Sequence, residues 1–201
     1  MNLKKIIIGF IVLFTGVMVG LAPRFFKRKP AFASDSPIAE WKTISLKNTE
    51  GKETVLSGLK GDIFVVYFGF SHCPDMCPLA IEEIGAALKG LRGFSDRVTP
   101  VFISVDPERD SPEILKKYVS TFPGNSLVAL TGSKKDIDSL QSGFGVVSRK
   151  VILPSKAEGY GVDHTLLIYL IDKNGNILAA FPTGTNPEDL TKAITVWMDK
   201  V

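Results

Sequence analysis

The chain has 201 residues, enough for one domain and a short additional segment. Its net charge of +3 comes from 24 basic and 21 acidic side chains, but residues 1–33 hold six of the basic ones and no acidic one. Residues 34–201 therefore carry 18 basic against 21 acidic side chains, and they contain no basic stripe. This charge pattern argues against nucleic acid as a partner.

The N-terminal segment is apolar and predicts a membrane anchor. Residues 6–22 form a run of 17 residues without a charge, with two lysines before it and four basic residues after it. This length is at the short limit for a membrane-spanning helix and exceeds the usual apolar region of a signal peptide. Small residues at 31 and 33 leave cleavage as an alternative. We expect residues 1–33 to remain as an uncleaved anchor and residues 34–201 to form the folded domain.

Strands and helices alternate along the domain. Continuous apolar runs predict two buried central strands, and apolar residues at helical spacing, with serine at two of the expected caps, predict the helices between strands. In chain order we expect strands at 41–46, 63–68, 101–105, 127–130, 166–171 and 177–181, and helices at 80–91, 111–122, 133–144 and 185–197. The last two strands flank a hairpin turn at 172–176. The order predicts an α/β fold, with a mixed sheet flanked by helices on both faces.

The two cysteines of the chain, Cys73 and Cys77, lie between the strand at 63–68 and the helix that follows it. Their spacing of four residues lets one helical turn bring the two sulfur atoms close together. The N-terminus of a helix also favours thiolate over thiol. The pair is therefore suited either to a redox-active disulfide or to a soft metal ion.

His164 is the candidate for a third ligand. It lies in the loop that is expected to lead into the strand at 166–171, and the ends of neighbouring strands in such a sheet lie side by side. Two thiolates and one imidazole would form a soft, three-coordinate site that suits Cu(I). The alternative is that His164 caps or packs against the local structure.

Three blocks of sequence resemble the Sco/SenC family of copper-binding proteins that assemble cytochrome oxidase. They are YFGFSHCPDMCP at 67–78, PVFISVDPERDSP at 100–112 and Asp163-His164, and the likeness extends over about residues 38–200. The resemblance implies a thioredoxin-like fold and copper, as Cu(I) or also Cu(II), bound by Cys73, Cys77 and His164. It also implies an inner-membrane protein whose domain faces the periplasm. Its partners would be the copper-receiving subunit of cytochrome c oxidase and a periplasmic copper donor.

Other polar residues near the site each have two interpretations. Asp163 either orients the His164 ring or caps the turn. Asp75 is either a weak oxygen ligand for Cu(II) or an acidic residue that the helix dipole favours. His72 would complete a zinc site of two cysteines and two histidines, but adjacent residues rarely both reach one small ion. The charged loop at 106–110 is either solvated or a docking site for a partner.

A thiol–disulfide oxidoreductase is the alternative function, with Cys73 and Cys77 as the redox couple that reduces the cysteines of an oxidase subunit or another target outside the cytoplasm. Redox enzymes of the thioredoxin type have two residues between their cysteines, whereas this chain has three. They also place a cis-proline before the strand that here begins near 166, where this chain has Val162-Asp163-His164-Thr165. These differences favour copper loading over an enzymatic role.

Overall fold

The fold was obtained as a computed structural model, which describes residues 37–201 except 92, 94, 123, 125 and 153–158. The predicted anchor, residues 1–33 with its apolar run at 6–22, lies outside the described residues. Within the described part, no helix combines the length and the apolar character that crossing a membrane requires.

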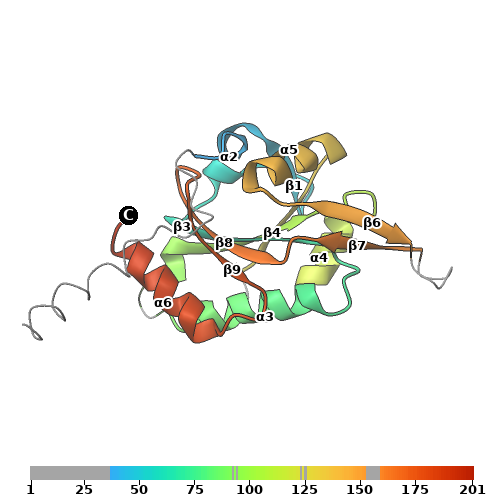
Figure 1. The fold of residues 1–201 in the computed structure, drawn as a ribbon. Coiled ribbons are helices and arrows are strands. Elements are labelled where there is room, and N and C mark those ends of the chain that lie inside the picture. The colour runs from blue at the N-terminus through green and yellow to red at the C-terminus, as the bar shows by residue number, and fades with distance from the viewer. Residues whose placement is uncertain (1–36, 92, 94, 123, 125, 153–158) are drawn as a thin grey trace, which may run out of the picture. The chain divides into compact units, whose positions relative to one another are not determined.

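A seven-stranded mixed sheet forms the centre of the domain, in the order β2-β1-β5-β4-β3-β8-β9 (Figure 1). The strands are β1 (Ser45–Asn48), β2 (Glu53–Val55), β3 (Ile63–Gly69), β4 (Val98–Ser104), β5 (Val128–Thr131), β8 (Leu167–Asp172) and β9 (Ile177–Pro182). β3, β4 and β5 are parallel neighbours, and β1, β8 and β9 pair antiparallel with their neighbours. The predicted mixed α/β sheet is therefore confirmed.

Helices cover both faces of the sheet, as predicted. They are α2 (Glu40–Thr43), α3 (Met76–Lys89), α4 (Pro112–Val119), α5 (Lys134–Phe144) and α6 (Pro187–Met198). Figure 1 shows α3 and α6 on one side of the sheet and α2 and α5 on the other. A short 3-10 helix, Leu56–Gly58, lies between β2 and β3, and another, Ser95–Arg97, lies between α3 and β4.

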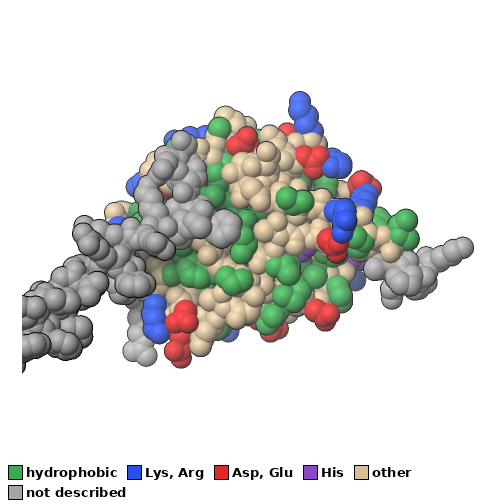
Figure 2. Space-filling model, in the orientation of Figure 1, with side chains coloured by type: hydrophobic (Ala, Val, Ile, Leu, Met, Phe, Trp, Pro, Cys, Tyr) green, Lys and Arg blue, Asp and Glu red, His purple; other side chains and the backbone are tan. Residues whose placement is uncertain are grey.

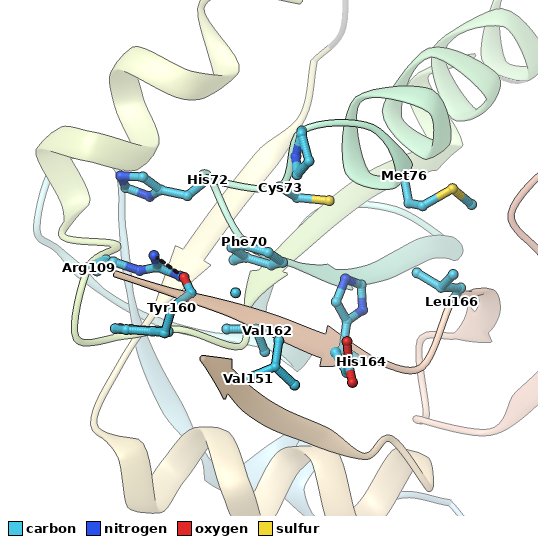
Figure 3. A pocket seen from close by; sticks show the side chains of 13 residues that line it. Phe70, His72, Cys73, Met76, Arg109, Val151, Tyr160, Val162, His164 and Leu166 are labelled. Atoms are coloured by element: carbon cyan, nitrogen blue, oxygen red, sulfur yellow. Dashed lines mark hydrogen bonds between the residues drawn. The ribbon is translucent and has the colours of Figure 1, made fainter. Parts of the chain in front are cut away.

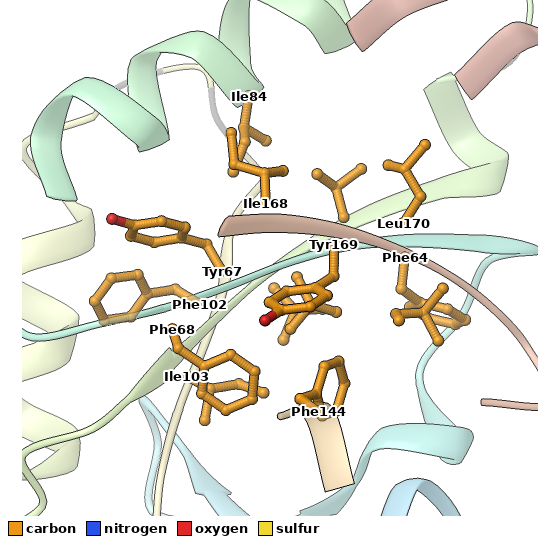
Figure 4. Packing of buried hydrophobic residues seen from close by; sticks show 14 of the residues in the cluster. Phe64, Tyr67, Phe68, Ile84, Phe102, Ile103, Phe144, Ile168, Tyr169 and Leu170 are labelled. Carbon is orange, nitrogen blue, oxygen red and sulfur yellow. The ribbon is translucent and has the colours of Figure 1, made fainter. Parts of the chain in front are cut away.

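The two central strands, β3 and β4, lie in the middle of the core. Every residue of β3 is buried, because one of its faces packs against α3 and the other against α5. On the α5 side, the ring of Phe68 lies 5.0 Å from that of Phe144. On the α3 side, Tyr67 and Ile168 lie towards Ile84 (Figure 4). Burial on both faces explains why β3 and β4 appear in the sequence as continuous apolar runs.

Local signals place several element boundaries as predicted. Ser111 caps α4 by accepting a hydrogen bond from the Ile114 N–H at 3.3 Å, and Ser133 caps α5 in the same way. The β8–β9 hairpin turns at residues 172–176, where the Asp172 carboxylate accepts two backbone N–H groups. Gly175 has a φ of 90°, and a Cβ there would lie 2.9 Å from the Cβ of Trp41.

Two sequence predictions were wrong. The strand expected at 41–46 begins only at Ser45, as β1, and its first part is instead the short helix α2, which packs the fully buried Trp41 with its ring 5.0 Å from that of Phe64. The second error concerns a hairpin that the sequence did not indicate. β6 (Ser148–Ile152) and β7 (Tyr160–His164) form a separate two-stranded sheet, so His164 ends a strand rather than lying in a loop.

Charged side chains of both signs are mixed on the surface. On the face shown in Figure 2, Lys and Arg side chains lie beside Asp and Glu side chains and do not form a continuous basic stripe. Several of them form exposed ion pairs, including Lys134 with Asp138 at 2.6 Å. Such pairs contribute little to stability, on the order of 0–1 kcal/mol each.

Candidate metal centre

Cys73 and Cys77 occupy the turn from β3 into α3. Cys73 lies in the turn and is half-buried, whereas Cys77 lies in the first turn of α3 and is fully buried. The backbone N–H of Cys77 donates a hydrogen bond to the Cys73 sulfur at 3.3 Å. Both are free thiols in the structure. The two sulfur atoms lie close together, as the spacing predicted, but Cys73 precedes the helix, so the turn from β3 into α3 brings them together and not a full helical turn.

His164 joins the two cysteines from the end of β7. Its Nε2 atom lies 3.6 Å from the Cys77 sulfur, and the potential ligand atoms of Cys73, Cys77 and His164 all lie within 4.8 Å of one another. The predicted approach of His164 to the cysteine turn is therefore confirmed. It is β7, in the small second sheet, that carries the histidine to the end of β3.

The imidazole is oriented so that Nε2 faces the sulfur atoms. Nδ1 lies 3.0 Å from the carbonyl oxygen of Thr165, which occupies that side of the ring. Tyr67 and Phe70 pack edge-on against the ring, with centroids 6.0 and 5.9 Å away. A carbonyl that accepts from Nδ1–H leaves Nε2 free to bind a metal ion. Asp163, considered above for this role, instead pairs with Arg149 at 2.9 Å and is exposed.

Gly69, the last residue of β3, makes room for the buried sulfur. A Cβ atom at this position would lie 2.8 Å from the Cys77 sulfur and 2.8 Å from a ring carbon of Phe102. These separations are far below normal contact distances, so only glycine fits without moving the thiol. Close packing against the Cys77 sulfur therefore explains why a glycine stands at the third position of the YFG sequence, which precedes the cysteines.

The two thiols differ in acidity. The hydrogen bond from the Cys77 thiol lowers the pKa of Cys73 to about 4, helped by His164 and by backbone N–H groups and opposed by burial. The same hydrogen bond, together with burial, raises the pKa of Cys77. Burial is also the main reason that the pKa of Tyr67 is raised, with a further contribution from Cys77. At neutral pH the pair therefore holds one thiolate, on Cys73, and one thiol.

Two other sequence candidates lie outside this group. Asp75 precedes α3, is exposed, and makes no side-chain hydrogen bond to the first turn of the helix. The His72 side chain is 51% exposed, and its Nδ1 lies 2.9 Å from the Ser71 hydroxyl. The cluster of potential ligands contains one histidine, His164, so the arrangement does not provide the two-histidine zinc site.

The charged loop at 106–110 was predicted to be solvated or to dock a partner, and the first interpretation was wrong. Asp106 and Asp110 are 2% and 0% exposed. Arg109 is largely buried and lies over the ring of Tyr160. The sequence did not indicate a role at the site for Arg109, Asp110 or Tyr160. The signal that could have indicated one was the position of the loop, directly after a central strand of the sheet.

An open cavity of about 1000 Å³ lies next to the three ligands (Figure 3). Cys73, Pro74 and Met76 line it from the cysteine turn, and Tyr160 and His164 line it from β7. Apolar side chains make up much of the remaining wall, among them Phe70, Val151, Val162 and Leu166. The cavity gives molecules in solution access to Cys73 and His164.

The fold and the site define a class of protein: an α/β domain of the thioredoxin type that carries a soft metal site of two sulfur atoms and one imidazole. Such a donor set suits Cu(I) better than hard ions, which prefer oxygen ligands. The match to the SCO1/SenC family model covers residues 37–199, and the chain belongs to this family.

Individual relatives agree with this assignment. The chain is 37% identical to a SCO2-like protein of Rickettsia prowazekii over 61% of this chain and 60% of that one. It is 32% identical to the mitochondrial SCO1 homolog of Homo sapiens over 77% of this chain and 51% of that one. The matches thus span between half and three fifths of the length of these two curated relatives. The structure of Bradyrhizobium japonicum ScoI with copper bound is similar with a TM-score of 0.67 and 35% identity, covering 76% of this chain and 95% of that one.

Proposed function

We propose that this protein binds one copper ion through Cys73, Cys77 and His164 and helps to load the copper centre of a cytochrome c oxidase. The observation that carries the proposal is the convergence of three soft ligand atoms within 4.8 Å, from segments far apart in the sequence. Membership of the SCO1/SenC family supports it, as does the similarity to ScoI of Bradyrhizobium japonicum, which was solved with copper bound.

The donor set favours the reduced ion. Thiolates are soft ligands and select Cu(I), and the low pKa of Cys73 supplies one of them at neutral pH. Cys77 must lose its proton when a metal binds, so metal binding releases a proton from the reduced protein. Bound copper would be the cargo that the protein passes on, and the cavity beside Cys73 and His164 is the side from which an acceptor can reach it.

A membrane-anchored location is part of the proposal. Residues 6–22 would anchor the protein in the inner membrane, with the domain facing the periplasm. There its partners would be a copper donor and the copper-receiving subunit of the oxidase. A compartment that allows cysteines to be oxidised also suits a pair of thiols whose redox state controls metal binding.

Thiol–disulfide reduction is the second candidate function, and the unequal environment of the two cysteines favours it. Cys73 is half-exposed beside the cavity with a pKa of about 4, while Cys77 is buried behind it. The Cys73 thiolate would attack one sulfur of a target disulfide and displace the other sulfur as a thiolate. Cys77, after losing its proton, would then attack Cys73 and release the second target thiolate. The target would gain two electrons and this protein would end as the Cys73–Cys77 disulfide.

The copper stoichiometry and the X-ray absorption spectrum of the purified, reduced protein test the main proposal. We expect one copper ion bound by two sulfur atoms and one nitrogen. Copper bound by oxygen and nitrogen alone, or no copper retained under reducing conditions, would refute it. In that case, reduction of a disulfide-containing oxidase subunit at a rate that depends on Cys73 would favour the second candidate.

A further inference from the structure

The loop at 106–110, between β4 and α4, contacts both segments that carry the proposed ligands. On one side it meets the turn that holds Cys73. On the other side it meets β7, which holds His164, through the hydrogen bond between Arg109 and Tyr160 drawn in Figure 3. The contacts come from neighbouring residues of the loop, Arg109 and Asp110. Both bind partners that are distant in sequence.

Asp110 fastens the cysteine turn. Its carboxylate is 0% exposed and accepts three hydrogen bonds, from the Ser71 N–H at 3.0 Å, the Ser71 hydroxyl at 2.5 Å and the Ser104 hydroxyl at 2.6 Å. Ser104 is the last residue of β4, and Ser71 lies two residues before Cys73. The carboxylate therefore connects the cysteine turn to the end of a central strand.

Arg109 fastens the strand of the histidine. Its Nη1 donates a hydrogen bond to the carbonyl oxygen of Tyr160 at 2.8 Å, and its guanidinium lies 3.8 Å from the centre of the Tyr160 ring. Asp106 completes the arrangement, since its carboxylate accepts from Arg109 Nε and, at 2.8 Å, from the Tyr160 hydroxyl. Tyr160 is the first residue of β7, and His164 is the last.

Phe70 lies between Arg109 of the loop and the proposed ligand His164. Its ring centre lies 5.7 Å from the Arg109 guanidinium and 5.9 Å from the imidazole of His164. Phe70 is also the neighbour of Ser71, which Asp110 holds. A shift of Arg109 would therefore change the position of the His164 imidazole through two sets of contacts, one through β7 and one through Phe70.

Two of the proposed ligands, Cys73 and His164, need contacts that hold them in position because they lie outside the seven-stranded sheet. Cys73 lies in a turn, and His164 lies in the separate β6–β7 sheet. Only Cys77 has a place fixed by a long element, the helix α3. A three-coordinate site requires all three atoms to hold their positions to within a fraction of an ångström.

We propose that Arg109 and Asp110 are positioning residues of the metal site: Asp110 holds the Cys73 turn, and Arg109 holds β7 so that His164 meets the two sulfur atoms. This inference rests on the proposed copper-binding function. Neither residue ligates the ion. Partners that orient ligands from outside typically change metal affinity by about 10–100-fold when they are removed.

Variants of the full-length protein test the Asp110 side by Cu(I) affinity, measured in competition with a chelator. Asp110→Ala removes both acceptor oxygens and so all three hydrogen bonds, and we expect a loss of at least about tenfold. Asp110→Asn keeps the shape and removes the charge, so it should stay within about threefold of wild type if position is what matters. An equal loss in both variants would mean that the charge acts on the ion, and would overturn positioning.

If Asp110→Ala does not fold, substitutions of Ser71 test the same contact between Asp110 and the cysteine turn. Ser71→Ala deletes one hydrogen bond to Asp110 at a half-buried position and should weaken Cu(I) binding several-fold. Ser71→Thr retains the hydroxyl and should restore affinity. Glu108→Gln is the matched control, because it removes a charge from the same loop at an exposed pair with Lys150. It should leave the affinity unchanged; a loss in Glu108→Gln equal to that in the Asp110 variants would contradict the assignment.

The Arg109 side is tested by a double-mutant cycle with the ligand it positions. Arg109→Ala alone should lower Cu(I) affinity by about tenfold, but should have almost no further effect when combined with His164→Ala. A general loss of structure would instead lower the affinity equally in both backgrounds, and that result would overturn the proposal. In the metal-free protein, NMR contacts between the Phe70 and His164 ring protons should weaken in Arg109→Ala and persist in Glu108→Gln.

The wild-type protein separates this inference from the function on which it rests. If wild type fails to bind Cu(I), the proposed function is wrong. If wild type binds Cu(I) and the Asp110, Ser71 and Arg109 variants bind it equally well while folded, only the positioning role is wrong.

Discussion

His164 Nε2 lies 3.6 Å from Cys77 Sγ, although the two residues are 87 positions apart in the chain. β3 and α3 position the sulfur, while β7 positions the imidazole. The site is therefore a product of the tertiary fold and does not exist in the unfolded chain. A metal ion that binds only the folded state stabilises it by mass action.

The two histidines provide a matched pair of substitutions. His164→Ala removes one of three ligands and should weaken Cu(I) binding by more than the ~10–100-fold typical for loss of an outer partner. His72→Ala removes the exposed histidine next to Cys73, which is not among the candidate ligands, and should weaken binding much less than His164→Ala. Chelator competition measures both, and circular dichroism checks that both variants are folded. Equal Cu(I) affinities for His164→Ala and wild type would show that the ligand set is wrong.

Gly69→Ala should displace the Cys77 sulfur, because the added Cβ would lie 2.8 Å from it. We expect weaker Cu(I) binding and a loss of stability of about 1–3 kcal/mol, as is usual for overpacking a core. Gly58→Ala is the control, since its Cβ would meet nothing within 4 Å. Thermal unfolding and Cu(I) titration of both variants check this. A Gly69→Ala protein that matches Gly58→Ala in both measurements would contradict the proposed crowding.

Alkylation of Cys73 in the metal-free, reduced protein should depend weakly on pH. The thiolate is the reactive form and prevails above the pKa, which is lowered from 9.0 to about 4. The rate constant with iodoacetamide should therefore stay within about twofold between pH 8 and pH 5, and fall only as the pH approaches 4. An ordinary cysteine would lose roughly tenfold per pH unit over this range. Cys73→Ser should abolish the reaction, because Cys77 is buried; a steep decline below pH 8 in wild type would refute the lowered pKa.

Mild oxidation should join Cys73 and Cys77 and abolish copper binding. The reaction removes two electrons and two protons from the dithiol, and no thiolate remains to act as a ligand. Mass spectrometry should show the loss of two hydrogens and no alkylatable thiol, and reduction should restore Cu(I) binding. Retention of copper after complete disulfide formation would argue against ligation by sulfur.

A phosphatase fusion tests the proposed location. The basic residues after the apolar segment nominally favour a cytoplasmic domain, but long domains are exported despite unfavourable flanking charge. Alkaline phosphatase fused after Val201 should be active, because that enzyme must leave the cytoplasm to form its disulfides. A fluorescent protein that matures only in the cytoplasm should be dark at the same position. An inactive phosphatase with a bright fluorescent fusion would place the domain inside the cell.

Elements that their own local sequence pattern indicates were predictable from the sequence. β3 is buried along its whole length, so its apolar run could be read directly, and the serine caps of α4 and α5 act within one helical turn. The helix α2 was missed because its conformation depends on tertiary packing of Trp41 against Phe64. The β6–β7 hairpin was missed because its exposed faces give a polar sequence without a clear alternation of burial.

The candidate ligands could be found from residue type together with the family resemblance, but the loop that contacts their segments could not. Cysteine and histidine are rare in this chain, and their chemistry limits what they can do together. Arg109 and Asp110 belong to a charged run, which usually indicates a solvated loop. Their burial depends on Tyr160 and Ser71, which are 51 and 39 residues away in the sequence. A local sequence pattern cannot indicate contacts between residues so far apart.

Because Cys77 is buried, the proposed metal site is accessible from the side of Cys73 and His164. The Cys77 side chain is fully buried against Gly69, whereas Cys73 and His164 border the open cavity. An ion held by all three atoms can thus be approached from one side only. Ligands of an acceptor would replace Cys73 or His164 first, and the bond to Cys77 would be the last to break. The order of ligand exchange during transfer would then follow from how deeply each ligand is buried.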